Sequence, residues 1–250
     1  MNILLTNDDG INAAGINILY DNLKRKGHKL VVVAPDKEQS ATSHSITLHN
    51  PLRIIKQKKN FYAVTGTPTD CVILAEQVIT SDDIDLVISG INAGPNMGED
   101  VLYSGTVAAA LEAMFLKIPS IAISMASFID LHFKTGAKFI VELLDKGMAD
   151  IIKEGEIFNI NVPNKKYEEV KGVKITQLGH RHYDDFVTQQ CDPRGRNIYW
   201  IGGKAVWEKD EGTDTKAVSE GYVSITPMAP QFTQKKSFQK IQNWLDKNEV

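Results

Sequence analysis

The chain has 250 residues, 42% of them hydrophobic, and a formal net charge of −3. These values allow one large domain, or a domain with an extension, that needs no disulfide or structural metal to fold, and the near-balanced charge disfavours a general nucleic-acid binder. Because the two cysteines, Cys71 and Cys191, are widely spaced and no basic leader or apolar run of about 18 residues is present, we expect a cytoplasmic protein without a membrane segment.

The first 165 residues alternate short apolar runs with helical patterns. Strands are expected at 2–6, 28–34, 61–65, 85–89, 120–125 and 158–162, and helices at 15–26, from Thr67 onward, at 105–117 and near 136–145. The alanine-rich segment at 105–117 strongly predicts a helix, and the helix before it begins with Thr67-Pro68-Thr69-Asp70, a sequence typical of a capped helix start. Nearly continuous apolar strands that alternate with helices predict a mostly parallel sheet covered on both faces.

The sequence changes character after about residue 165, so we expect a core at 1–165 and a C-terminal extension at 166–250. Strands are expected at 173–178 and 221–226, with a polar, glycine-rich and charged stretch between them. A polar helix is expected at 235–248, and its apolar stripe contains Phe238, Ile241, Trp244 and Leu245. Because such a stripe is too apolar to stay exposed, we expect the extension to pack on the core or on a partner subunit.

Polar residues follow three of the expected strands. Residues 7–10 (NDDG) follow the first, 36–40 follow the second, and 90–96 follow the strand at 85–89. Ligands of doubly wound sheets bind at the carboxyl ends of the strands, where these side chains should converge. The expected edge of the sheet is therefore rich in oxygen donors from segments that are distant in sequence.

Adjacent carboxylates at Asp8 and Asp9 would repel each other at a partly buried strand end, and a divalent cation would relieve that repulsion. With Ser40 and Asn92 they form an all-oxygen set, which suits Mg²⁺, Mn²⁺ or Ca²⁺ better than zinc or copper. Taken alone, Asp9-Gly10 is equally well explained as a solvated turn, because Asp-Gly is a common turn pair.

Ser104-Gly105-Thr106 opens the expected helix at 105–117. A hydroxyl, a residue without a side chain and the free amides of a helix start would cradle an anion, although plain helix capping explains the same residues. The chain contains no G-x-x-x-x-G-K-[ST] loop and no G-x-G-x-x-G after its first strand, which disfavours ATP hydrolysis and dinucleotide binding. A metal site beside an anion cradle is the arrangement that phosphate transfer requires.

Seven segments, distributed in order over nearly the whole chain, carry a resemblance to a known family: ILLTNDDGI, VVAPDKEQSA, HSIT, GTPTDC, SGINAGPNMGEDVLYSGTVAAALE, FNINVP and EGYVSITP. On these motifs the chain resembles the SurE family of survival proteins, which are 5′-nucleotidases acting on nucleoside monophosphates. The resemblance implies one divalent ion, Mn²⁺ or Mg²⁺, and a phosphate pocket. The implied metal ligands are Asp8, Asp9, Ser40 and Asn92, and the pocket would contain Asn96 and Ser104-Gly105-Thr106.

The resemblance also implies the architecture of the whole chain. A Rossmann-like core would carry a C-terminal β-hairpin and helix extension that is exchanged between subunits, giving a homodimer or homotetramer. One position departs from the family, because Gln39 stands where arginine is frequent beside the metal-binding serine. This departure leaves phosphate affinity and substrate preference open.

We therefore expect a divalent-metal-dependent 5′-nucleotidase with Asp8 and Asn96 as catalytic residues and a small-molecule nucleotide as substrate. Other phosphoesters and polyphosphate remain open as substrates, and either a metal-activated water or Asp8 is the nucleophile. One alternative is a haloacid-dehalogenase-type phosphatase that forms an aspartyl phosphate, although that family has D-x-D after its first strand. The other is a non-catalytic nucleotide or metal sensor on the same fold.

Overall fold

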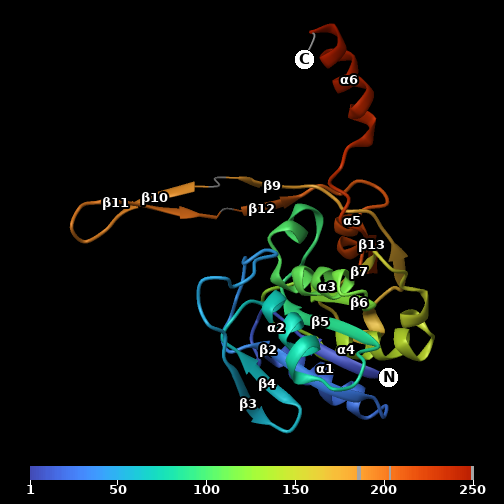
Figure 1. Cartoon of the computed structure of the whole chain (residues 1–250). Helices are drawn as coiled ribbons and strands as arrows, with labels where there is room; N and C mark the ends of the chain where they lie inside the picture. The colour runs from blue at the N-terminus through green and yellow to red at the C-terminus, as the bar shows by residue number, and fades with distance from the viewer. Residues whose placement is uncertain (185–186, 203, 249–250) are drawn as a thin grey trace.

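A nine-stranded sheet forms the centre of the computed structural model, which describes residues 1–184, 187–202 and 204–248. Its strand order is β3-β4-β2-β1-β5-β6-β7-β13-β8 (Figure 1). The six strands from β4 to β7 are parallel, and β3 is antiparallel at one edge. Next to β7, the antiparallel strand β13 leads to the other edge strand, β8, which is parallel to β13. This topology confirms the mostly parallel, Rossmann-like sheet that the alternating pattern predicted.

Each of the six core strands expected from the sequence is present. One further strand, β3, was missed because all of its residues are exposed and its sequence, IIKQK, is not a continuous apolar run. The strands of the main sheet are β1 Asn2–Thr6, β2 Lys29–Pro35, β3 Ile54–Lys58, β4 Phe61–Val64, β5 Leu86–Ala93, β6 Ser120–Met125, β7 Ile157–Val162, β8 Val173–Ile175 and β13 Val223–Met228.

Helices cover both faces of this sheet. On one face α1 (Ala14–Lys24) packs with α4 (Phe133–Asp145), and on the other α2 (Pro68–Leu74) packs with α3 (Gly105–Phe115) (Figure 1). Successive residues of β1 pack on opposite faces of the sheet. Ile3 and Leu5 belong to the core beneath α1 and α4, whereas Leu4 belongs to the core beneath α2 and α3. The expected capping box at the start of α2 is confirmed. Short turns complete this part: η1 Ala75–Ile79, η2 Gly98–Leu102, η3 Met148–Ile151 and η4 Tyr167–Glu169.

The C-terminal part contains the expected hairpin, but the two strands expected from the sequence do not form it. Those strands are β8 and β13, and both join the main sheet, which therefore crosses the expected division at residue 165. The polar stretch between them forms a long two-stranded arm that extends away from the sheet (Figure 1). In the arm, β9 (Arg181–Asp184) pairs with β12 (Lys204–Trp207), and β10 (Val187–Cys191) pairs with β11 (Asn197–Ile201). A short helix, α5 (Asp214–Ser219), follows the arm.

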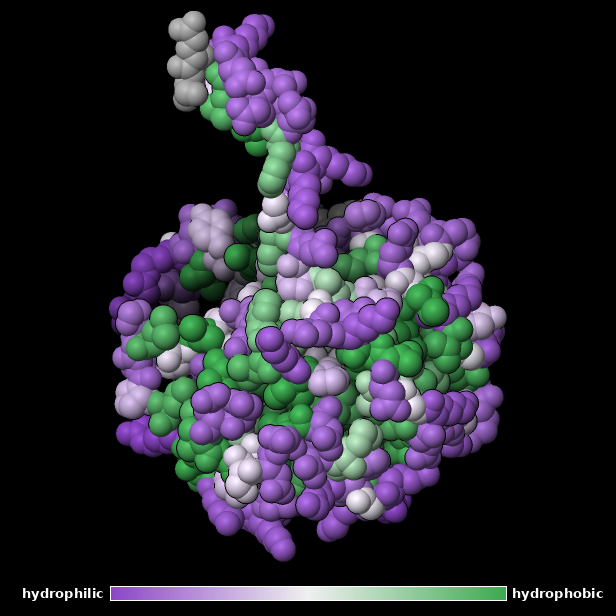
Figure 2. All heavy atoms as spheres, turned by 45° about the vertical axis from the view of Figure 1, so that its right-hand side comes forward, coloured by the Kyte–Doolittle hydropathy of each residue, from purple (hydrophilic) through white to green (hydrophobic). Residues whose placement is uncertain are grey.

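The chain ends in η5 (Lys235–Ser237) and α6 (Phe238–Lys247). Figure 2 shows this segment standing clear of the rest of the molecule. Phe238, Ile241 and Trp244 of the expected apolar stripe are exposed, so no other element of the described chain covers them. None of the described helices has the length and hydropathy needed to cross a membrane.

Candidate functional site

The carboxyl ends of β1, β2 and β5 meet at one edge of the sheet. Strand β1 lies between β2 and β5, and Thr6 at its end is opposite Ser89 of β5. The Gln39 N–H donates to the Asp8 carbonyl at 2.8 Å, which joins the segment after β2 to the segment after β1. The Ala93 N–H donates to Asp9 Oδ2 at 3.0 Å, which joins the end of β5 to the same place. The convergence expected from the three sequence segments is therefore present.

The NDDG segment is a tight turn as well as a carrier of carboxylates. The buried Asn7 side chain closes the turn, with Nδ2 donating to the Gly10 carbonyl at 2.9 Å and Oδ1 accepting from the Gly10 N–H at 3.2 Å. Gly10 has a φ of +96°, a conformation that residues with a side chain rarely adopt. The turn and site interpretations of this motif are thus compatible, because the turn holds Asp8 and Asp9 at the strand end.

Asp8 lies against the start of α3. Asp8 is 5% exposed, and its carboxylate accepts a hydrogen bond from the hydroxyl of Thr106, a fully buried residue. A Cβ atom on Gly105 would lie only 2.8 Å from Asp8 Cβ, so this position has no room for a side chain. The strand-end carboxylate and the helix start that the sequence singled out separately are therefore in direct contact.

Burial and mutual repulsion shape the electrostatics of the two aspartates. Burial raises the pKa of Asp8 above its ordinary value, although the hydrogen bond from Thr106 acts in the opposite direction. Burial, together with the charge of Asp8, raises the pKa of Asp9 to about 6. The carboxylate of Glu38 raises both pKa values further, which places a third acidic group near the pair. This environment favours binding of a cation, which would lower the cost of two ionised carboxylates.

The donor chemistry of the four predicted metal ligands fits a hard divalent cation. Asn92 donates from Nδ2 to the Gly94 carbonyl at 2.8 Å, so its Oδ1 acceptor points away from that bond. Ser40 is exposed and its hydroxyl donates to Glu38 Oε1 at 2.6 Å. Within the described residues there is no cluster of three or more His, Cys, Asp or Glu side chains placed to hold a metal. The predicted set consists instead of two carboxylates and two neutral oxygen donors. Such a donor set suits Mg²⁺ or Mn²⁺ better than zinc.

Ser104 caps α3. Its hydroxyl oxygen accepts from the Val107 N–H at 3.0 Å, so the plain capping interpretation of this residue is correct as far as it goes. Because the oxygen acts there as an acceptor, the hydroxyl proton is left to donate to another group. Capping and anion binding therefore use different parts of the same side chain.

Asn96 takes part in a second layer of polar side chains. Its Nδ2 donates to Ser124 Oγ at 2.8 Å, and Asn161 Oδ1 accepts from its backbone N–H at 2.9 Å. Among the described residues no hydrogen bond joins Asn96 to Asp8 or Asp9. The layer is nevertheless adjacent to the metal candidates, since Ser124 of β6 is opposite both Asn92 and Asn161 in the sheet.

Sequence reasoning missed most of this second layer. Asn159 and Asn161 donate from their side chains to the Asn96 carbonyl at 2.8 and 2.9 Å. Both are fully buried, and Asn159 Oδ1 has no hydrogen-bond partner among the described residues. The signal was present in FNINVP, where two asparagines interrupt an otherwise apolar strand.

A large cavity lies at the opposite edge of the sheet. It has a volume of about 780 Å³ and is lined by the amino ends of β1 and β2, the last turns of α1 and the turn between β3 and β4. Helices that follow parallel strands end at this edge, so their carbonyl groups make it electronegative, and the lysines that line it suit helix C-termini. Among the segments that line it, none carries the paired carboxylates, and we do not place the chemistry there.

A doubly wound sheet with two carboxylates and a capped helix start at its carboxyl edge defines a Rossmann-like α/β protein with an acidic site at its strand ends. Within that class the assignment is specific, because the family model for survival protein SurE matches residues 3–185. The chain belongs to this family.

Relatives match over almost the full length. The chain is 49% identical over 247 residues to a protein of Actinobacillus succinogenes named 5′-nucleotidase SurE, covering 98% of this chain and 99% of the relative. A protein of the same name from Haemophilus influenzae is 47% identical over 98% of both chains. The crystal structure of the Sure protein from Aquifex aeolicus superimposes with a TM-score of 0.86 at 43% identity, covering 98% of this chain and 99% of that one. The fold is therefore shared over almost the entire chain.

Proposed function

We propose that the chain is a divalent-metal-dependent 5′-nucleotidase that hydrolyses nucleoside monophosphates to nucleoside and phosphate. The relatives that carry this activity in their names match 98% of the chain at up to 49% identity, which supports the reaction class. The contact between Asp8 and the start of α3 is the observation that carries the proposal, because it combines a cation-binding carboxylate with the amides of a helix start. A phosphate monoester bound there would meet both.

Asp8, Asp9, Ser40 and Asn92 would hold one Mg²⁺ or Mn²⁺ ion, and Ca²⁺ remains a further candidate occupant. When bound, such an ion neutralises charge on the phosphoryl group and orients it for attack. The chain supplies the remaining alignment, since Thr106 holds the carboxylate of Asp8 in place and the Ala93 N–H holds that of Asp9. Both carboxylates are thus oriented before any ion arrives.

The phosphate would bind at Ser104-Gly105-Thr106. Ser104 has a hydroxyl proton to donate, and Gly105, which has no side chain, lets Asp8 lie directly against this turn. Asn96, whose amide is fixed by Ser124, would contribute a further donor from the second polar layer. Preorganised donors of this kind stabilise the charge that develops on phosphate oxygens during transfer.

Three finer points belong to the same proposal. Nucleoside monophosphates are the principal substrates, with other phosphoesters and polyphosphate as secondary ones. The exposed apolar stripe of α6 and the arm would mediate assembly into a homodimer or homotetramer. The protein would act in the cytoplasm.

The proposal is tested by phosphate release from a panel of nucleoside monophosphates, with added Mn²⁺ or Mg²⁺ and after EDTA treatment. We expect activity that EDTA abolishes and metal restores, and near-complete loss in Asp8→Asn and Asp9→Asn. Asp21→Asn, on the exposed face of α1, is the control and should retain full activity. Full activity of the chelated protein would disprove the metal assignment. Acid quenching with labelled substrate then decides the nucleophile, since label on the protein would indicate Asp8 and its absence would indicate water.

A further inference from the structure

The base of the arm is tied to the segment that leads into the candidate phosphate turn. That segment is η2, Gly98–Leu102, and it is followed by Tyr103 and then by the Ser104 cap of α3. The Tyr103 carbonyl accepts from the Ser43 N–H at 3.1 Å, so the segment also touches the loop that carries Ser40. A displacement of η2 would therefore act directly on the Ser104-Gly105-Thr106 turn, which follows it in the chain.

Asp214 joins η2 to the residues that enter the arm. This fully buried side chain accepts from the Gly98 N–H at 3.0 Å through Oδ2 and from the Gly179 N–H at 2.8 Å through Oδ1. A Cβ atom on Gly98 would lie 2.7 Å from the Gly179 carbonyl oxygen, so the two backbones are in close contact. One carboxylate thus joins the two segments where their backbones lie in close contact.

Arg181, the first residue of β9, makes the second connection. Its guanidinium forms an ion pair with Asp100 of η2 through both terminal nitrogens, and the two side chains are each 12% exposed. Its backbone N–H donates to the Glu99 carboxylate at 2.8 Å. The same guanidinium lies 5.1 Å from the ring centroid of Trp207, the last residue of β12, so both strands at the arm base take part.

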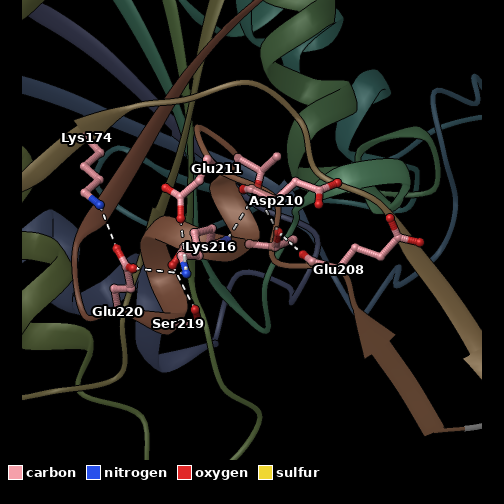
Figure 3. A network of polar contacts seen from close by, with 9 residues as sticks. Lys174, Glu208, Asp210, Glu211, Lys216, Ser219 and Glu220 are labelled. Carbon is pink, nitrogen blue, oxygen red and sulfur yellow. Dashed lines mark hydrogen bonds and ion pairs between the residues drawn. The ribbon is translucent and has the colours of Figure 1, made fainter.

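Ion pairs join the helix that carries Asp214, α5, to the elements beside it. Lys174 of β8 and Lys216 of α5 both form ion pairs with Glu220, at 2.7 and 3.3 Å. Figure 3 shows the two lysines pointing toward this carboxylate. Lys216 also pairs with Glu211 at 3.4 Å, which fixes the loop between the arm and α5. Asp214 therefore connects η2 to a helix whose end is joined to strand β8 of the main sheet.

We propose that Arg181 is a positioning residue, which holds η2 through Asp100 and thereby places the Ser104-Gly105-Thr106 turn for phosphate binding. The inference rests on the proposed function, because it assumes that this turn receives the phosphate. Arg181 touches neither substrate nor metal in this scheme. Because Arg181 belongs to the arm, this ion pair connects the arm base to the candidate phosphate turn.

The experiment is a double-mutant cycle with Arg181→Gln, Asp100→Asn and the double variant, measured in the full-length protein with Mn²⁺. The readouts are kcat and KM for a nucleoside monophosphate, the inhibition constant of inorganic phosphate, and the Kd of Mn²⁺. We expect kcat/KM to fall roughly ten- to a hundredfold, as for small misplacements of binding groups. The inhibition constant of phosphate should rise in parallel, Mn²⁺ binding should stay unchanged, and the double variant should be no worse than the poorer single variant.

A matched control lies at the far end of the arm. Arg196 pairs with Asp192 at 2.7 Å but its side chain is 71% exposed, so Arg196→Gln removes an arginine–aspartate pair of the same arm without touching η2. It should leave all three kinetic and inhibition constants at wild-type values. Arg181→Lys keeps the charge but not the two-point contact, and it replaces Arg181→Gln if that variant does not fold.

The outcomes separate the two proposals. If wild type releases phosphate but the Arg181 variant that folds keeps its kcat/KM and its phosphate inhibition constant, the positioning role is wrong and the proposed function stands. A fall in kcat alone, with KM and phosphate inhibition unchanged, would indicate loss of folded protein and would equally overturn the positioning role. If wild type releases no phosphate from any substrate, the proposed function fails and the positioning role fails with it.

Discussion

Replacing Thr106 by valine would test whether the carboxylate of Asp8 is oriented from the helix start. Valine has nearly the same shape as threonine, so Thr106→Val removes the hydroxyl from a site that is fully buried without opening a cavity. The lost hydrogen bond is to a buried acidic group, and such bonds contribute about 1.5–3 kcal/mol. Since 1.4 kcal/mol is a factor of about ten in an equilibrium constant, we expect Mn²⁺ to bind roughly ten- to a hundredfold more weakly, in the range known for groups that orient metal ligands.

The assay is calorimetric titration of metal-free protein with Mn²⁺, with Thr106→Ser as the matched control because serine keeps the hydroxyl. Thermal unfolding without metal accompanies it, and an unchanged far-UV spectrum verifies that the fold is intact. Thr106→Ser should bind Mn²⁺ nearly as tightly as wild type. Equal affinity of the valine and serine variants would refute the reasoning, because the hydroxyl of Thr106 would then have no part in orienting Asp8.

Three further predictions concern other parts of the molecule. Ser104→Ala should lower kcat/KM by about ten- to a hundredfold and the free energy of unfolding by about 1 kcal/mol through loss of the cap, whereas a matching loss of Mn²⁺ affinity would place the turn in the metal site. Burial raises the pKa of Asp100 from 3.8 to about 6. The charges of Glu99 and Asp214 also raise this pKa, whereas the guanidinium of Arg181 lowers it. The folded state thus binds this proton more tightly, and the free energy of unfolding should fall as pH rises from about 4 to 6. Asp100→Asn should remove this contribution, at most about 3 kcal/mol in total, in urea titrations over that pH range, whereas an unchanged pH dependence would contradict the shift. Truncation after Ala229, which spares β13, should reduce the size of the oligomer in size-exclusion chromatography, and an unchanged profile would count against assembly through α6.

The sequence predicted the core of the fold well because its strands are nearly continuous apolar runs. Expected and observed bounds agree for 2–6 and 120–125, and they differ by a few residues elsewhere. Strand β3 and the arm strands β10 and β11 could not be found in this way, since all of their residues are exposed and their hydrogen bonds, rather than burial, define them. The hydrophobic pattern of the sequence could predict strands that are buried, but not strands that are exposed.

The candidate site was predictable to the level of segments but not of contacts. Motif position placed Asp8, Asp9, Ser40 and Asn92 at one sheet edge, and the structure brings their segments together there. The contact between Asp8 and Thr106, however, depends on how α3 packs, which no local pattern records. The link from Arg181 to Asp100 joins residues 81 positions apart and lay beyond sequence reasoning for the same reason.

The position of the arm between β8 and β13 has a consequence for chain-length variation. These strands are direct neighbours in the sheet, and the Thr176 N–H donates to the Ile225 carbonyl at 3.0 Å, so the arm leaves and re-enters the fold at almost one point. Closing a loop grows more costly only with the logarithm of its length, by about 0.6 kcal/mol for each doubling. Residues added to or removed from the arm tip should thus hardly alter the folding equilibrium. The outer arm is free to diverge in length among homologues, while the residues at its base are not.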